Sequence, residues 1–154
     1  MQIAPLVSQH VAEVVHGNWT DIYLDDVTAN VTFEEAVALP PGLTNSIAML
    51  VKHIGFYNWV VMERLKGSDP VIDDSNGFTV TINNNEDWQQ VRRDALYSFA
   101  KLAEMVKGLP DEKLQGLTPA GNSTFYKTLH GIAEHAPYHL GQIVLIKKLL
   151  RANK

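Results

Sequence analysis

Cysteine is absent from the chain, which excludes disulfides and any protein thiol that acts as a nucleophile or a metal ligand. A metal ion would therefore be held by histidines and carboxylates, and thiol chemistry would need a small-molecule thiol. No apolar run approaches the roughly 18 residues that a membrane-spanning helix needs. Residues 1–10 lack the basic start and long apolar stretch of a secretory signal, so we expect a cytoplasmic protein.

An excess of positive charge is also missing. The 154 residues include 13 Lys and Arg against 17 Asp and Glu, which gives a net charge of -4 with neutral histidines. Because nucleic-acid binding depends on clustered cations, we expect no nucleic-acid partner and, without an apolar span, no membrane partner. The hydrophobic share of 45% is typical of a globular protein. We expect a single domain over residues 1–154.

Four segments have the apolar periodicity of amphipathic helices, at roughly residues 3–16, 44–65, 85–107 and 122–151. The motifs Pro40-Pro41-Gly42 and Gly108-Leu109-Pro110 separate them. The connections between the helices are long. One contains a short helical pattern over residues 32–39, and another has an alternating stretch over residues 78–82. The pattern predicts an all-α fold, a four-helix bundle of the up-down-down-up type with long connections.

Two histidines four residues apart form the most informative local pattern. His135 and His139 lie one helical turn apart on one face, a spacing that allows two imidazoles to bind one metal ion. Apolar residues continue this face and direct it into the bundle: Ile132, Ile143, Ile146, Leu150. The alternative is a pair of core histidines that hydrogen-bond to the backbone or to each other.

His53 lies on the inward face of the second predicted helix, together with Met49, Leu50, Tyr57 and Val60. If the two helices are neighbours, this third imidazole can reach the other two. Three neutral imidazoles and an open position are typical of catalytic zinc and also suit nickel or iron. A cluster of three structural histidines without metal is the alternative. We interpret the remaining histidines as surface or helix-end residues: His10, His16, His130.

Three further side chains are candidates for orienting a ligand or facing a substrate. Gln142 follows His139 by three residues on the inward side and either serves the site or satisfies a neighbouring backbone group. Tyr57 and Glu63 are the other two, and each has an alternative role as core packing or solvated surface. The sequence does not identify a catalytic residue.

The sequence resembles the DinB-like superfamily of metal-binding four-helix bundles. The resemblance is carried by Lys52-His53-Ile54 and by the motif HxxYHxGQI, which begins at His135 and ends at Ile143. Pro137 departs from the family pattern, in which a helix-favouring residue is expected. The resemblance implies a homodimer that binds zinc or nickel, or else iron or manganese, through three histidines. Some members resemble transferases or isomerases that use a low-molecular-weight thiol such as bacillithiol or mycothiol.

Two functions are consistent with these residues. In the first, the protein is an enzyme of the thiol S-transferase or hydrolase type, in which a metal ion activates a thiol or water against a small-molecule substrate. In the second, it is a non-catalytic stress protein that binds a metal or a small molecule. A closed coordination shell would favour the second function, since structural metal sites leave no position for substrate.

Overall fold

The computed structural model describes residues 2–152, and within them the chain forms seven helices and no strand. This confirms the predicted all-α class. The helices are α1 (Ala4–Glu13), α2 (Leu24–Ala29), α3 (Phe33–Val37), α4 (Ile47–Leu65), α5 (Asn85–Lys107), α6 (Asp111–Gln115) and α7 (Phe125–Ala152). Among the described residues, no helix combines the length and the apolar character that crossing a membrane requires.

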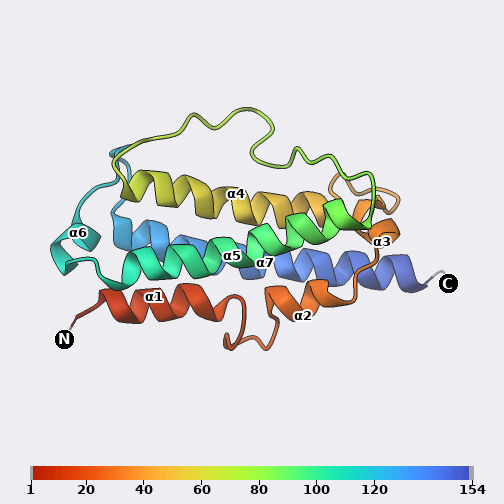
Figure 1. Cartoon of the computed structure of the whole chain (residues 1–154), viewed down its shortest axis with the longest axis horizontal. Helices are drawn as coiled ribbons and strands as arrows, with labels where there is room; N and C mark the ends of the chain where they lie inside the picture. The colour runs from red at the N-terminus through yellow and green to blue at the C-terminus, as the bar shows by residue number, and fades with distance from the viewer. Residues whose placement is uncertain (1, 153–154) are drawn as a thin grey trace.

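The four longest helices lie side by side (Figure 1). Helix α5 packs against α1 and α4, and α7 packs against the same two helices from the other side. Figure 1 shows α1 and α7 running in one direction and α4 and α5 in the opposite direction. Each of these four helices therefore buries an apolar face against its neighbours. The contact between α4 and α7 brings the predicted histidine helices together.

Side-chain caps explain where the long helices begin. Ser46 caps α4, since its side chain accepts a hydrogen bond from the Met49 amide, so this helix begins two or three residues later than the sequence predicts. Asn84 caps α5 in the same way, and the Thr124 hydroxyl accepts from the Lys127 amide at the start of α7. Helix α7 continues through Pro137 without an interruption.

The inward face of α5 forms much of the core. Trp88 is fully buried, and its indole N–H donates to the Val31 carbonyl at 2.9 Å. The other tryptophans differ from Trp88, because Trp59 is 44% exposed and Trp19 is 99% exposed. Core packing therefore accounts for only one of the three. Further apolar side chains at helical spacing on the same face of α5 are also buried: Ala95, Phe99, Leu102, Val106.

Cations near the C-terminus of α7 hold the short helices in place. Arg151 forms two 2.8 Å hydrogen bonds with the buried carboxylate of Glu35 on α3. Lys147 donates to the Val27 carbonyl of α2 at 2.6 Å. The sequence pattern predicts a helix near α3 but not α2 or α6, which are too short to show a full apolar period.

The connection from α4 to α5 is the longest one, and Figure 1 shows that it runs along the length of α4. Residues 78–82 within it alternate between half-buried and exposed side chains, as predicted, but they form no strand. Their half-buried members, Phe78, Val80 and Ile82, pack against the helical core. This connection therefore covers one face of α4 near the middle of the helix.

Candidate metal centre

Three histidines from two helices meet between α4 and α7. The Nε2 atom of His135 lies 3.0 Å from that of His53 and 2.9 Å from that of His139. One ligand atom from each residue lies within 4.8 Å of the others, and no further group of three or more such side chains meets this condition in residues 2–152. His53 and His139 are buried, and His135 is half-buried. The structure thus brings together the three histidines that the sequence singles out.

The second ring nitrogen of two of these histidines already has a partner. His53 Nδ1 lies 2.7 Å from the backbone carbonyl of Asn76, and His139 Nδ1 lies 2.7 Å from Gln142 Oε1. A carbonyl oxygen only accepts hydrogen bonds, so both Nδ1 atoms carry the proton. In the neutral rings, the Nε2 atoms of His53 and His139 then present lone pairs.

With these tautomers, the two short contacts at His135 cannot both be hydrogen bonds, because each would need a proton of its own. His135 Nε2 carries at most one proton, which can point toward His53 or His139 but not toward both. At least one contact therefore opposes two lone pairs, which a shared cation would resolve. Two nitrogens bound to one ion at about 2.0–2.1 Å lie roughly 2.8–3.4 Å apart for angles of about 90–110°. The observed spacings fit this range.

Burial keeps all three imidazoles neutral near pH 7. Burial, together with the electrostatic effect of the nearby rings of His139 and His53, lowers the pKa of His135 to about 4. Burial also lowers the pKa of His53 and of His139, although the hydrogen bonds to Asn76 and Gln142 oppose the effect. Neutral imidazole is the form that binds metal, so these environments favour coordination.

Aromatic side chains surround the cluster. The ring of Phe78 stacks on that of His53, with 3.9 Å between centroids and 12° between planes. Tyr57 contacts the rings of His53 and His135 edge-on, at 5.0 and 5.1 Å between centroids. Such an apolar shell restricts water and strengthens electrostatic interactions at a metal site.

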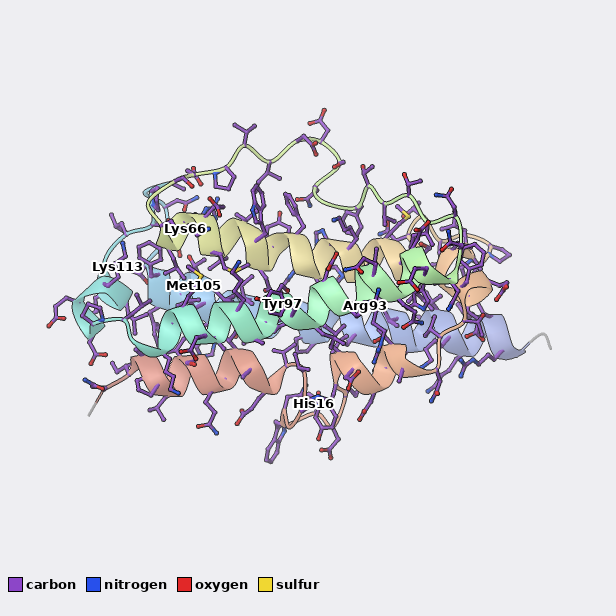
Figure 2. The ribbon with its side chains drawn as sticks, viewed as in Figure 1. His16, Lys66, Arg93, Tyr97, Met105 and Lys113 are labelled. Atoms are coloured by element: carbon purple, nitrogen blue, oxygen red, sulfur yellow. The ribbon has the colours of Figure 1, made fainter. Side chains whose placement is uncertain are left out.

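The three additional candidates have different positions. Gln142 binds His139 directly, and Tyr57 packs on two of the histidines. Glu63 lies ten residues beyond His53 on α4, which is about 15 Å along a helix axis. Its carboxylate bonds to Lys66 at 2.6 Å and faces the end of α4, where Figure 2 labels Lys66. The structure therefore does not bring Glu63 to the cluster.

The remaining histidines lie elsewhere. Figure 2 shows His16 in the connection between α1 and α2, where it lies 3.5 Å from Asp25. His10 and His130 contact each other edge-on, with 5.1 Å between ring centroids, at the interface of α1 and α7. None of these three histidines belongs to the cluster.

Asn76 and Phe78 contact the cluster, but sequence reasoning did not find them. The dipeptide Asn76-Gly77 is a turn signal that the sequence does contain. A turn signal does not show which helix the turn packs against, so it could not connect Asn76 to His53.

Gln142 also lines a cavity of about 270 Å³ between α7 and the segment that precedes α4. Its Oε1 is used by His139, so its N–H groups remain to donate. The other residues that line this cavity are uncharged: Leu43, Thr44, Asn45, Leu50, Leu145, Ile146.

Comparisons with known proteins place the chain in a family. A search of curated proteins found no match to the sequence. The model of the DinB superfamily matches residues 19–143, a range that includes all of α4, ends within α7 and contains the three histidines of the cluster. The match covers most of the chain and agrees with the all-helical structure. This protein belongs to the DinB superfamily.

Proposed function

We propose that the protein binds one divalent cation through His53, His135 and His139 and is a metal-dependent enzyme of the thiol S-transferase or hydrolase type. The observation that carries the proposal is the convergence of three Nε2 atoms when two of the Nδ1 atoms are already hydrogen-bonded. A bound cation of this kind lowers the pKa of a water molecule or thiol that binds beside it. Zinc and nickel are the first candidates, and iron and manganese are others.

In this proposal the chain's own residues have separate roles. Asn76 and Gln142 hold two imidazoles in the tautomer that leaves Nε2 free. Phe78 and Tyr57 exclude water from the side of the cluster that they cover. The uncharged cavity beside Gln142 supports a small-molecule substrate, and the thiol would be a low-molecular-weight compound because the chain has no cysteine.

A second function is that of a non-catalytic stress protein that binds a metal or a small molecule. The burial of His53 and His139 under Phe78 favours it, since a closed site serves structure better than catalysis. The two functions differ in whether the bound metal exchanges a ligand. In Co²⁺-loaded protein, azide or a small thiol changes the visible absorption spectrum only when a coordination position is open.

The first test is metal content by mass spectrometry of the purified wild type after incubation with Zn²⁺ or Ni²⁺ and removal of unbound ions. About one ion per chain is expected to stay bound through this removal, whereas His53→Ala and His139→Ala are expected to bind the ion too weakly to retain it. His130→Ala is the matched control, because His130 lies on α7 outside the cluster. A wild type that binds neither ion, and that stays metal-free after the same incubation with Fe²⁺ or Mn²⁺, refutes the metal site and the enzyme proposal with it.

We propose an up-down-down-up four-helix bundle in a single domain, which the mutual packing and directions of α1, α4, α5 and α7 support.

We also propose a homodimer without nucleic-acid or membrane partners. Exposed apolar side chains on one face of α7, Tyr138, Leu145 and Leu149, support the dimer. Light scattering of wild type and Leu145→Glu tests it, with a dimer expected only for the wild type.

A further inference from the structure

Residues 73–78, here called the covering turn, form a compact unit against the histidine cluster. Asp73 accepts hydrogen bonds from the amide and hydroxyl of Ser75, at 2.9 and 2.6 Å. The Asn76 amide donates to the Asp73 carbonyl, and the Phe78 amide donates to the Ser75 carbonyl. These hydrogen bonds all lie within the turn itself.

The sequence of the turn suits this conformation. Asn76 has φ of 51° and Gly77 has φ of 74°, and Asn and Gly tolerate such left-handed values best. Gly77 also lies directly against Phe56 of α4. A Cβ atom at position 77 would meet the Phe56 ring at 2.3 Å, so no side chain fits there unless the turn or Phe56 moves.

Three contacts join the covering turn to the metal-site residues of α4. The Asn76 carbonyl accepts the Nδ1 proton of His53 at 2.7 Å. The Asn76 side chain accepts a hydrogen bond from the Tyr57 hydroxyl at 2.5 Å. Phe78 stacks on the face of the same His53 ring. One residue, Asn76, thus connects the ligand His53 and its neighbour Tyr57 through two different groups.

We propose that the covering turn is a positioning element of the metal site: Asn76, held by Tyr57 and by the fit of Gly77 against Phe56, fixes the tautomer and ring orientation of His53. The inference rests on the proposed function, because it assigns His53 to a metal. His53 comes from a different helix than the other two histidines, so its orientation decides whether three nitrogens or only two converge. Partners of ligand imidazoles typically change metal affinity by about 10–100-fold when they are removed.

Binding and the conformation of the turn are then linked. If the turn favours metal binding, metal binding must stabilise the turn to the same extent. Hydrogen exchange of the amides in residues 73–78 is therefore expected to slow when Zn²⁺ is added to the wild type. Exchange in α6, which lies at one end of the bundle (Figure 1), serves as the internal reference.

The decisive experiment measures Zn²⁺ affinity, by competition with a chromophoric chelator, and the absorption spectrum of bound Co²⁺. Gly77→Ala, which forces the turn and Phe56 apart at a position with a positive φ, is expected to bind Zn²⁺ about 10–100-fold more weakly and to change the Co²⁺ spectrum. Tyr57→Phe removes one hydrogen bond but keeps the ring, and about two- to tenfold weaker binding is expected. Asn76→Gly is expected to weaken Zn²⁺ binding as much as Tyr57→Phe does. Asn76→Asp keeps an oxygen that accepts from the Tyr57 hydroxyl and is expected to retain the affinity.

Controls separate positioning from general stability. Tyr138→Phe removes a hydroxyl from another tyrosine beside the cluster and is expected to bind as the wild type does. Circular dichroism checks that each variant is folded. If Gly77→Ala does not fold, the affinity of Tyr57→Phe tests the role of the covering turn. Folded Gly77→Ala and Tyr57→Phe proteins with wild-type affinity and spectrum overturn the inference while leaving the metal site intact. A wild type that binds no metal refutes both.

Discussion

The hydrogen bond between Gln142 and His139 gives the sharpest quantitative prediction. The substitution Gln142→Leu removes the oxygen that accepts the Nδ1 proton of His139 at 2.7 Å. When Nε2 binds metal, the proton must remain on Nδ1, and it then lacks a partner in a residue that is only 6% exposed. The metal-free protein can avoid this state, because His139 can move its proton to Nε2.

The cost of the unpaired Nδ1 proton therefore falls on the metal-bound form alone and lowers the metal affinity. A buried donor that loses its acceptor costs about 1–3 kcal/mol, which corresponds to roughly 5- to 150-fold weaker binding. Gln142→Glu is the matched variant, since a carboxylate oxygen still accepts the proton and is expected to retain the affinity or increase it. The exposed substitution Gln90→Leu on α5 controls for the loss of an amide and is expected to have no effect.

Zn²⁺ affinity by chelator competition at pH 7.5 is the assay, together with a double-mutant cycle. In a His139→Ala background, Gln142→Leu is expected to change the residual affinity little, since the bond that it removes no longer exists. Equal affinities of wild type and Gln142→Leu in the His139-containing protein would refute the assigned role of Gln142. An equal loss in both backgrounds would show that Gln142 acts through another contact.

Two further predictions follow from the pKa of His135 and from the core. The metal-free protein is expected to lose stability as the pH falls from about 6.5 toward 4. Burial and the neighbouring rings lower the pKa of folded His135 to about 4, so the unfolded state binds more protons in that range. Urea unfolding across this pH range measures the loss, which is expected to be smaller in His135→Ala. Trp88→Phe removes the hydrogen bond to the Val31 carbonyl and leaves a cavity, so the free energy of unfolding is expected to fall by about 2 kcal/mol. An unchanged denaturation midpoint would contradict this expectation. The control is Trp59→Phe, because Trp59 on α4 is partly exposed.

Much of the fold was predictable because it depends on local periodicity. The apolar pattern of residues 85–107 predicts α5 and its buried face, including Phe99 and Leu102, as observed. The start of α4 was predicted less well, because Thr44, Asn45 and Ser46 are all good caps and only the structure shows that Ser46 is used. Helix α2 was missed because six residues do not show a full amphipathic period.

By itself, the sequence determined that this protein is all-helical and that His53, His135 and His139 lie on inward helix faces, since helical spacing fixes the face of a residue. It also supplied the motif by which membership in the DinB superfamily was expected. Only the tertiary structure decided that α4 and α7 are neighbours and that the three Nε2 atoms converge. It alone brought Asn76 to His53 and left Glu63 at the far end of α4. Such contacts join residues that are distant in the chain, and the packing of helices and loops, not local spacing, determines them.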